Sequence, residues 1–591
     1  MTRLPLRPLA RILDARAKGE NPDVIERENL RLRHENERDR LRAQAEGRLL
    51  VLAVFFLCGF AMIGLRMGHL ANSEPAEPRA ATTTAKILAA RADIVDRKGR
   101  ILATNLTTHS LYAQPPLMID KARAAAELVK IFPDLDEERL LKDFNGARKF
   151  LWIKRRISPE QQQAVHDIGD PGLLYGPREM RLYPNGRLAA HVLGGAGFGR
   201  EGVRSAEVVG RAGVEREFDA ALRDPGRARE PLQLSIDLTV QAAVERVLAG
   251  GMRLMNAKGA AAVLMDAKTG EIVSLVSLPD FDPNEPPSNG ARGDAAPQFN
   301  RAVQGVYELG STFKVFAAAQ AIEEGLVSPG TWIETEGPMK WGRHRIRDFR
   351  DHGPALTVED IIVKSSNIGT ARMALMLGAE RQQVFLERLG FRSPTRLEMP
   401  EAQAARPLWP GKWSEIVSMT VGYGHGLSAS ATHLAAAYGT IVNGGRKVEP
   451  TLLVRDSFAQ GEAVISERTS KIMRKMMREV VVRGTASFGE VPGYAVGGKT
   501  GTADKPDPRG GYYDDKVIAT FASFFPADEP EYVLVVTLDE PEETSGKEPR
   551  RTAGWTAVPV AAEIIRRAAP LLGLAPEIED GAAVGVTLAA N

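Results

Sequence analysis

The chain has 591 residues, 43% of them hydrophobic and 26% charged, so it is long enough for several domains that each bury a core. Lysine and arginine total 77 against 75 aspartate and glutamate, and this balance gives no electrostatic reason to expect nucleic acid as a partner. The single cysteine, Cys58, excludes an internal disulfide. Because the nine histidines are scattered and no cysteine pair exists, we expect no metal site.

One segment is apolar enough to cross a membrane. Residues 49–65 carry no charge between Arg48 and Arg66, and the apolar run extends to Ala71. About 17 to 25 such residues cross a bilayer as a helix. A buried core helix would show a polar stripe, and the n-region of a cleaved signal peptide is far shorter than the 48 residues found here. We therefore predict an uncleaved signal anchor over residues 49–71.

The segment before the anchor is rich in basic residues. Residues 1–48 hold twelve lysines and arginines, so the positive-inside tendency predicts a cytoplasmic tail and an extracytoplasmic remainder, as in a bacterial inner-membrane protein. Alternating charges over residues 22–47 are typical of a solvated helix that continues into the span. A partner-binding role for this tail stays open.

After a short linker rich in alanine, proline and threonine, residues 72–230 predict a mixed α+β pedestal. The sequence ADIVDRKGRILATN indicates two short strands about an Arg-Lys-Gly turn, and helices are expected near residues 120–132 and 159–167. No nucleophile in this region has a base nearby in the sequence. We therefore expect the chemistry to lie further along the chain.

From Pro231 the pattern changes to apolar strands and longer helices. Two apolar runs, AAAVLMD and EIVSLVSLP, flank AKTG, which predicts a hairpin with a positive φ at Gly270. This turn holds the first of two Lys-Thr-Gly triplets. We interpret its lysine, Lys268, as a solvated turn residue.

The stretch YELGSTFK carries a candidate nucleophile. Ser311 is expected to open a helix that runs to about Glu324. The ordinary alternative is a capping serine followed by an unremarkable helical lysine, because a short motif such as Ser-x-x-Lys also occurs by chance. The functional interpretation is that positions i and i+3 bring the Lys314 amine beside the Ser311 hydroxyl. A lysine acts as a base if burial and nearby positive charge lower its pKa.

Two further motifs follow in order. Ser365, Ser366 and Asn367 are expected in a turn between helices, where the ordinary alternative is capping. Later, two glycines precede Lys499 at the start of a strand, and a glycine pair there suggests the close approach of a backbone or a ligand. The order Ser-x-x-Lys, Ser-x-Asn, Lys-Thr-Gly is the set found in penicillin-binding proteins and serine β-lactamases.

With these motifs in place, residues 91–572 resemble the class B penicillin-binding proteins, which are membrane-anchored peptidoglycan D,D-transpeptidases, and most of all the septal enzyme. The resemblance is carried by RADIVDRKGRILA, GRAGVEREFD, YELGSTFK, KSSNIGT, VGYGHGLSAS and GGKTGTA. It implies an α/β (α+β) fold: a penicillin-binding/serine β-lactamase-like transpeptidase domain (residues 231–572) after the pedestal and one transmembrane helix, with a tail at residues 573–591. Ser366 departs from the aspartate that many β-lactamases carry there.

The resemblance also implies roles for the motif residues. Ser311 would attack the carbonyl of the penultimate D-alanine of a stem peptide, with Lys314 as general base. Ser365 would pass a proton to the leaving D-alanine, and Asn367 would bind the substrate amide.

The Lys-Thr-Gly strand would bind the other end of the substrate. Lys499, Thr500 and Thr502 would hold the terminal carboxylate beside Gly501, and the backbone amides of Ser311 and Thr502 would stabilise the oxyanion. An amine from a neighbouring strand would resolve the acyl-enzyme, no cofactor is implied, and β-lactams would be covalent inhibitors.

Other functions remain open at this point. A β-lactamase or carboxypeptidase would use water as acceptor, but hydrolysis alone needs no pedestal or anchor. A penicillin sensor would be expected to carry a larger cytoplasmic domain or several spans. An elongation-type enzyme is the alternative within the family. By resemblance, the expected partners are a polytopic membrane glycosyltransferase and other division proteins.

Overall fold

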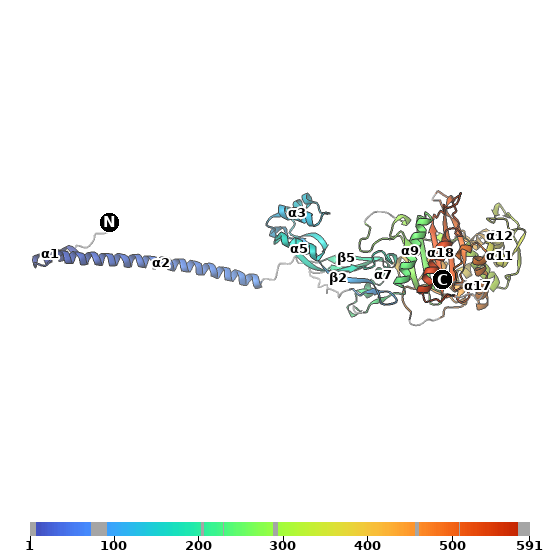
Figure 1. Ribbon diagram of the computed structural model, residues 1–591, viewed down its shortest axis with the longest axis horizontal. Helices are drawn as coiled ribbons and strands as arrows, with labels where there is room; N and C mark the ends of the chain where they lie inside the picture. Colours follow the sequence, from blue (N-terminus) through green and yellow to red (C-terminus); the bar gives the residue numbers. More distant parts are fainter. Residues whose placement is uncertain are drawn as a thin grey trace, which may run out of the picture. The chain divides into compact units, whose positions relative to one another are not determined.

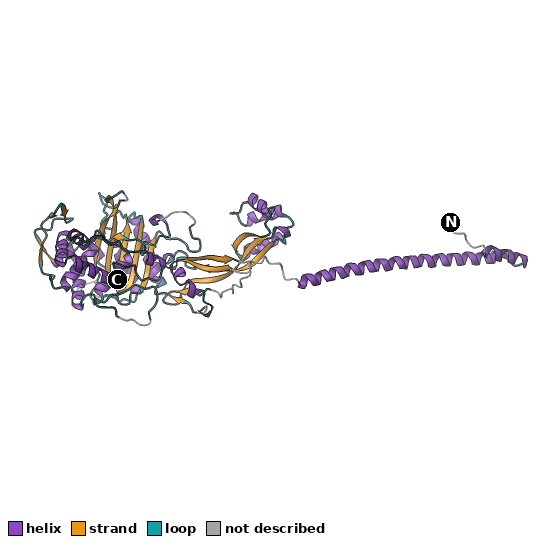
Figure 2. Cartoon of the chain, turned by 180° about the vertical axis from the view of Figure 1, so that it is seen from behind, coloured by secondary structure: helices purple, strands orange, loops and turns teal. Residues whose placement is uncertain are grey.

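The computed structural model describes residues 7–72, 91–201, 206–227, 230–287, 293–455, 460–507 and 509–576. The chain forms two units, Met1–Thr84 and Ala85–Asn591. Figure 1 follows the elements along the chain, and Figure 2 shows where helices and strands alternate. Most of the expected linker at residues 71–85 and most of the expected C-terminal tail lie outside the described residues.

The first unit consists of helices α1 (Arg7–Ala17) and α2 (Pro22–Asn72). The charged first part of α2 and its apolar second part form one continuous helix, as the sequence predicts. Apolar side chains such as Leu49 and Phe55 are exposed along the second part. Among the described residues, α2 is the one helix that is long and apolar enough to span a membrane.

The pedestal begins with the predicted strand pair, but the second strand is 13 residues long and not short as predicted. β1 and β2 flank a turn at Gly99, whose φ of 79° suits glycine. The strands are β1 (Ile94–Val95), β2 (Ile101–Ala113), β3 (Leu151–Ile157), β4 (Leu173–Leu182), β5 (Gly195–Glu201), β6 (Ala206–Ala212) and β7 (Leu232–Gln233). The helices are η1 (Pro115–Leu117), α3 (Lys121–Ile131), α4 (Glu137–Phe144), α5 (Pro159–Ile168), α6 (Ala190–Leu193), α7 (Gly213–Glu217), α8 (Asp219–Leu222) and η2 (Pro225–Arg227).

Strand β2 links two hydrophobic cores. Leu102 and Ala103, near its start, belong to the large core that continues into the C-terminal domain. Leu111 and Ala113, near its end, belong to a separate core with α3, α4 and α5. Strands β3 and β4 both pair with β2, while β1 pairs in parallel with β7. One strand therefore connects the core formed with α3, α4 and α5 to the large core shared with the C-terminal domain.

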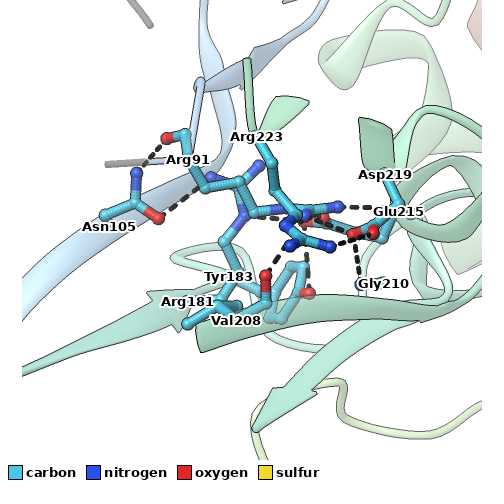
Figure 3. A network of polar contacts seen from close by, with 9 residues as sticks. All are labelled: Arg91, Asn105, Arg181, Tyr183, Val208, Gly210, Glu215, Asp219 and Arg223. Carbon is cyan, nitrogen blue, oxygen red and sulfur yellow. Dashed lines mark hydrogen bonds and ion pairs between the residues drawn. The ribbon is translucent and has the colours of Figure 1, made fainter. Parts of the chain in front are cut away.

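A buried ionic network fixes the base of the pedestal (Figure 3). Glu215 is fully buried and accepts hydrogen bonds from Nε of Arg91 and Nε of Arg181, both at 2.6 Å. Arg91 also contacts Asp219 at 2.6 Å, and the Tyr183 hydroxyl lies 3.3 Å from Glu215. Buried charges persist in a fold only when they are paired in this way.

The C-terminal domain is built on a five-stranded antiparallel sheet with the order β16-β17-β18-β8-β9. The predicted hairpin of β8 (Gly259–Asp266) and β9 (Ile272–Leu278) is confirmed, with Gly270 at φ 78°. β17 (Tyr512–Phe525) and β18 (Tyr532–Asp539) are neighbours, as predicted. β16 (Gly497–Pro506) pairs only with β17 in this sheet, so the second Lys-Thr-Gly triplet lies on an edge strand.

Helices cover both faces of this sheet, since β9 is buried along its whole length and β8 along almost all of it. α9 (Leu238–Leu254) and α18 (Ala557–Leu571) lie side by side against one face (Figure 1). α16 (Ala431–Val442), fully buried, packs against β8 and β18 from the other side with α17 (Glu467–Arg483). The site residues come from the elements on that second side.

The remaining helices are η3 (Gly293–Ala295), η4 (Gly310–Phe313), α10 (Lys314–Glu323), α11 (Val358–Lys364), α12 (Asn367–Leu377), α13 (Ala379–Arg388), α14 (Pro400–Ala404), α15 (Glu415–Gly422) and η5 (Ser487–Gly489). Three pairs of short strands complete the domain: β10 (Tyr307–Glu308) with β15 (Ser428–Ala429), β11 (Trp332–Glu334) with β14 (Ala355–Thr357), and β12 (Met339–Trp341) with β13 (His344–Ile346).

Candidate active site

Ser311 lies in a 3-10 turn that leads directly into a buried helix. The turn η4 begins at Gly310 and α10 begins at Lys314, so the predicted single helix starts with a tighter first turn. The Ser311 side chain caps neither element, and the capping alternative is wrong for this residue. Among the described residues its hydroxyl has no hydrogen-bond partner. An unpaired and partly accessible hydroxyl suits a nucleophile.

Lys314 is a fully buried lysine, which rules out the alternative of an ordinary solvated one. Its Nζ donates to the Ser365 carbonyl oxygen at 2.5 Å and lies 3.0 Å from Ser365 Oγ. Ser365 ends α11 in the left-handed region, at φ 64°. Because a non-glycine residue seldom adopts that conformation, strain is stored where the lysine binds.

Lys499 reaches the same hydroxyl from the edge strand. Its Nζ lies 2.9 Å from Ser365 Oγ and 3.1 Å from the Thr500 carbonyl oxygen, and the side chain is fully buried. In the described part of the chain neither Lys314 nor Lys499 forms an ion pair. Three motifs far apart in the sequence therefore meet at one oxygen.

The environment lowers the pKa of both amines. Burial lowers the pKa of Lys314 well below its ordinary value, the nearby Lys499 lowers it further, and Asp348 acts in the opposite direction. Burial lowers the pKa of Lys499 to about 7. A neutral lysine is therefore available near neutral pH to accept a proton.

The Ser-Ser-Asn turn combines capping with site geometry. Ser366 is buried and caps α12 by accepting from the Gly369 amide, so the capping alternative is confirmed for this residue. Its own hydroxyl donates to Asp348 at 2.6 Å. The Asn367 side chain donates to the Arg347 carbonyl oxygen at 2.9 Å and forms no hydrogen bond with either lysine.

Asp348 is a site residue that the sequence analysis missed. Besides the Ser366 hydroxyl, it accepts from the backbone amides of Asn367 and Ile368 at 2.5 and 3.0 Å. It therefore holds the first turn of α12, whose free N–H groups favour a carboxylate. The stretch RDFRDHG carries no motif, and only its position in space reveals the role.

The edge strand passes very close to the nucleophile turn. A Cβ atom on Gly501 would lie 2.2 Å from the Leu309 carbonyl oxygen, and one on Gly310 would lie 2.6 Å from that of Thr502. Glycine is required at both positions for this approach. The backbones of Ser311 and Thr502 thus border one site.

The two glycines before Lys499 are required for a different reason. A Cβ on Gly497 would lie 2.3 Å from the ring of Phe524, and one on Gly498 would lie 2.6 Å from the Ala522 carbonyl oxygen. The expected close approach is therefore made by the paired strand β17 and its aromatic side chains, not by a ligand.

The two threonines of the strand are oriented by neighbouring elements. Thr500 Oγ1 lies 2.7 Å from Thr485 Oγ1. Thr502 Oγ1 accepts from the Ala553 amide at 3.0 Å, which leaves its own proton free to donate. Lys268, in the first triplet, is exposed in the β8–β9 turn, whose backbone is held by Asp266, as the hairpin interpretation predicts.

Of the eight predicted site residues, the structure joins Lys314, Ser365 and Lys499 directly by hydrogen bonds. Ser311, Gly501 and Thr502 lie beside them through the strand-to-turn contact, and Thr500 contributes its carbonyl oxygen to Lys499. Asn367 lies next to Ser365 in the chain and points to Arg347 instead.

Two family models match this chain. One, described as the penicillin-binding protein dimerisation domain, covers residues 86–227, and the other, the penicillin binding protein transpeptidase domain, covers residues 260–566. The chain is 34% identical to the probable peptidoglycan D,D-transpeptidase FtsI of Caulobacter vibrioides, with 93% of each chain covered. It is 28% identical to the peptidoglycan D,D-transpeptidase FtsI of Escherichia coli K12, with 77% of this chain and 80% of the relative covered.

A solved structure has the same fold. The crystal structure of penicillin binding protein 3 from Mycobacterium tuberculosis, complexed with aztreonam, matches with a TM-score of 0.63 and 26% identity over 83% of this chain and 98% of that one. The predicted fold class is thereby confirmed. The chain belongs to the class B penicillin-binding proteins, with an N-terminal dimerisation-type pedestal followed by a transpeptidase domain.

Proposed function

We propose that the chain is a serine D,D-transpeptidase that cross-links peptidoglycan stem peptides through an acyl-enzyme on Ser311. The observation that carries this proposal is that Lys314 and Lys499 both hydrogen-bond to the Ser365 hydroxyl. Lys314, at the start of α10, follows the unpaired Ser311 by three residues. A lysine with a lowered pKa is the base that such a serine needs.

In the acylation step, Ser311 Oγ attacks the carbonyl carbon of the penultimate D-alanine while Lys314 takes its proton. The peptide bond to the last D-alanine breaks, and the leaving nitrogen receives a proton through Ser365 Oγ. Asn367 binds the substrate amide, for which its side-chain oxygen is available. The hydrogen bonds that both amines donate to Ser365 Oγ support this relay.

The edge strand β16 binds the rest of the substrate. Lys499 and the hydroxyls of Thr500 and Thr502 hold the terminal carboxylate, while Gly501 lets the strand lie against the nucleophile turn. The backbone amides of Ser311 and Thr502 donate to the oxyanion. An amine of a neighbouring strand then resolves the acyl-enzyme.

The division septum is the proposed place of action. FtsI relatives match over most of their length, which supports the septal enzyme over the elongation type. The apolar part of α2 would anchor the chain in the inner membrane with the catalytic domain on the periplasmic side. A polytopic membrane glycosyltransferase and other division proteins would be its partners, and β-lactams would acylate Ser311.

Labelling with penicillin tests the nucleophile. Labelled penicillin should attach to one peptide, which contains Ser311, and Ser311→Ala should abolish the label. The control variant Ser545→Ala removes an exposed hydroxyl and should label like the parent. Label that persists in Ser311→Ala contradicts the assignment, whereas release within seconds would identify a β-lactamase.

The orientation of the chain across the membrane needs a separate test. A reporter that is active only in the periplasm should work when fused after Asn591 and fail when fused after Gly47. The reverse pattern would contradict the proposed topology.

A further inference from the structure

A second group of polar side chains lies beside the nucleophile turn, on β10 and on the segment before β15. Glu308 is three residues before Ser311, and β10 pairs with β15. The Gly310 amide donates to the Gly424 carbonyl oxygen at 3.2 Å, so the segment that carries His425 touches the turn directly. The catalytic steps proposed above use neither Glu308 nor His425.

Two buried polar atoms in this group have no hydrogen-bond partner. Glu308 is 9% exposed; its Oε1 accepts from the Gly426 amide at 2.8 Å and from the Tyr512 hydroxyl at 3.0 Å, but its Oε2 is buried and unpaired. His425 Nδ1 is also buried without a hydrogen bond. Because buried polar atoms are almost always paired, two orphans in one place point to a missing donor.

The charge of the group is negative. Asp504 lies on β16, two residues after Thr502, and its side chain is exposed. Neither Glu308 nor Asp504 forms an ion pair with any lysine or arginine that the structure describes. The pKa of His425 responds to both: burial lowers it, the carboxylates of Glu308 and Asp504 oppose that effect, and Lys314 adds to it.

Aromatic rings enclose the histidine. The ring centroids of Tyr423 and Tyr512 lie 5.5 and 6.4 Å from that of His425. Tyr512 is 48% exposed, so the group borders solvent. Negative charge, unpaired acceptors and aromatic faces together favour a donor-rich cation over an anion or an apolar group.

We propose that Glu308, His425 and Asp504 form a binding site for a primary ammonium group of the peptidoglycan stem, next to Ser311. This inference rests on the transpeptidase function proposed above. An ammonium has three donors and no acceptor, so it satisfies Glu308 Oε2 and His425 Nδ1 at once. A hydroxyl or water offers fewer donors and no charge.

The amine has two possible sources, because donor and acceptor strands are copies of one polymer. If it is the acceptor amine, His425 accepts one proton from the ammonium, and the neutral nitrogen attacks the acyl carbon and forms a C–N bond. The nitrogen then gives its second proton to Lys314, which passes it to Ser311 Oγ as the ester bond breaks. If it belongs to the donor stem, it stays charged and aligns that stem for acylation.

Thioester donors and added amines distinguish the two sources. With the full chain in detergent, acylation is compared for a D-alanyl thioester peptide that carries a free side-chain amine and for its N-acetylated form. The acyl-enzyme is then partitioned between water and an amine acceptor such as D-alanine. Variants are Glu308→Gln, His425→Gln and Asp504→Asn, with Glu380→Gln as an exposed acidic control on α13.

If the site binds the donor stem, the ratio of the acylation rate with the free-amine donor to that with the acetylated donor should fall at least tenfold in the three variants. An acceptor site predicts a fall of the same size in the ratio of aminolysis to hydrolysis, and in His425→Gln the loss of a pH inflection in aminolysis. The control should keep both ratios. Folded variants that penicillin still acylates, with both ratios unchanged, would overturn the ammonium site; a parent chain that penicillin does not acylate would instead overturn the transpeptidase proposal.

Discussion

The amines of Lys314 and Lys499 converge on one oxygen, Ser365 Oγ, at 3.0 and 2.9 Å. A hydroxyl oxygen accepts two hydrogen bonds and donates one, so both amines contact it without displacing its own proton. Two charged ammonium groups this close would repel each other in a buried site. The arrangement is therefore most stable when at least one amine is neutral, which agrees with the lowered pKa of both.

The rate of acylation should depend on the charge of Lys499. Its pKa is about 7 in the free protein, so the fraction that carries the charge needed for a substrate carboxylate falls as the pH rises above 7. We expect the second-order rate constant for acylation by penicillin to decline by up to tenfold per pH unit above about pH 7. Stopped-flow measurements across pH 5.5 to 9.5, roughly the range in which the fold is expected to persist, would show this.

Lys499→Arg is the matched variant, because a guanidinium keeps its charge throughout this range. Its acylation should be slower overall and flat above pH 7. An identical decline in the variant would assign the inflection to another group.

The sequence alone predicted which motifs carry the site but not how they meet. Ser-x-x-Lys spacing places Ser311 and Lys314 on neighbouring positions of one turn, which is a local property. The bond from Lys314 to Ser365 spans 51 residues, and that from Lys499 to Ser365 spans 134, so both depend on how α10, α11 and β16 pack. No local pattern contains that packing.

The same limit explains the missed residues. Asp348 acts on the α11–α12 turn from a loop 18 residues earlier. Glu308 Oε2 is buried without a partner only because of the segments that pack around it. By contrast, the β8–β9 hairpin was predictable, since adjacent apolar runs and a turn glycine at position 270 suffice to specify it.

Burial of Lys499 should cost stability. Folding lowers its pKa from the ordinary lysine value of 10.5 to about 7, so the unfolded chain binds more protons between these values and stability rises with pH across that window. Lys499→Met removes the cost, and we expect its Tm at pH 7 to exceed that of the parent by about 2 °C or more. The difference should shrink as the pH approaches 10. A lower Tm for Lys499→Met at pH 7 would contradict this account.

Asp348→Asn should weaken the site through the α12 turn. The amide keeps one acceptor but loses the charge that binds the Ser366 hydroxyl and two backbone amides, so the cap is weakened by about 1 kcal/mol. With the opposing charge gone, the pKa of Lys314 falls further. Acylation by penicillin should slow by roughly tenfold, from the displaced Ser365 and the weaker base together.

Asp351→Asn is the control for this effect. Asp351 accepts only the Gly353 amide in the same loop and is exposed, so its substitution should change the rate less than twofold. Equal slowing in both variants would indicate a general loosening of the loop.

Glu215→Gln should destabilise the pedestal. The substitution removes the charge that Arg91 and Arg181 both contact (Figure 3). Both arginines are almost fully buried. Breaking a buried pair in this way costs about 3 to 5 kcal/mol. The temperature of the transition that unfolds the pedestal should fall by several degrees. Glu217→Gln, at an exposed position two residues later, should leave that temperature unchanged. Unaltered melting of Glu215→Gln would mean that the network contributes no net stability.

The two Lys-Thr-Gly triplets provide the sharpest comparison. Lys268 is exposed at the tip of the β8–β9 turn. Its triplet needs glycine for a backbone φ of 78° and because a Cβ on Gly270 would lie 2.2 Å from the Glu449 carbonyl oxygen. Lys268→Ala should change stability by no more than about 0.5 kcal/mol and leave acylation unaffected. Lys499 is buried against Ser365, and Lys499→Ala removes the cation proposed to bind the carboxylate, so acylation by penicillin should slow by about 100-fold or more. The measurement is the second-order rate constant for acylation by penicillin, determined on matched, folded proteins. An equal loss of rate in both variants, or a loss only in Lys268→Ala, would mean that the active triplet is not the one at residues 499–501.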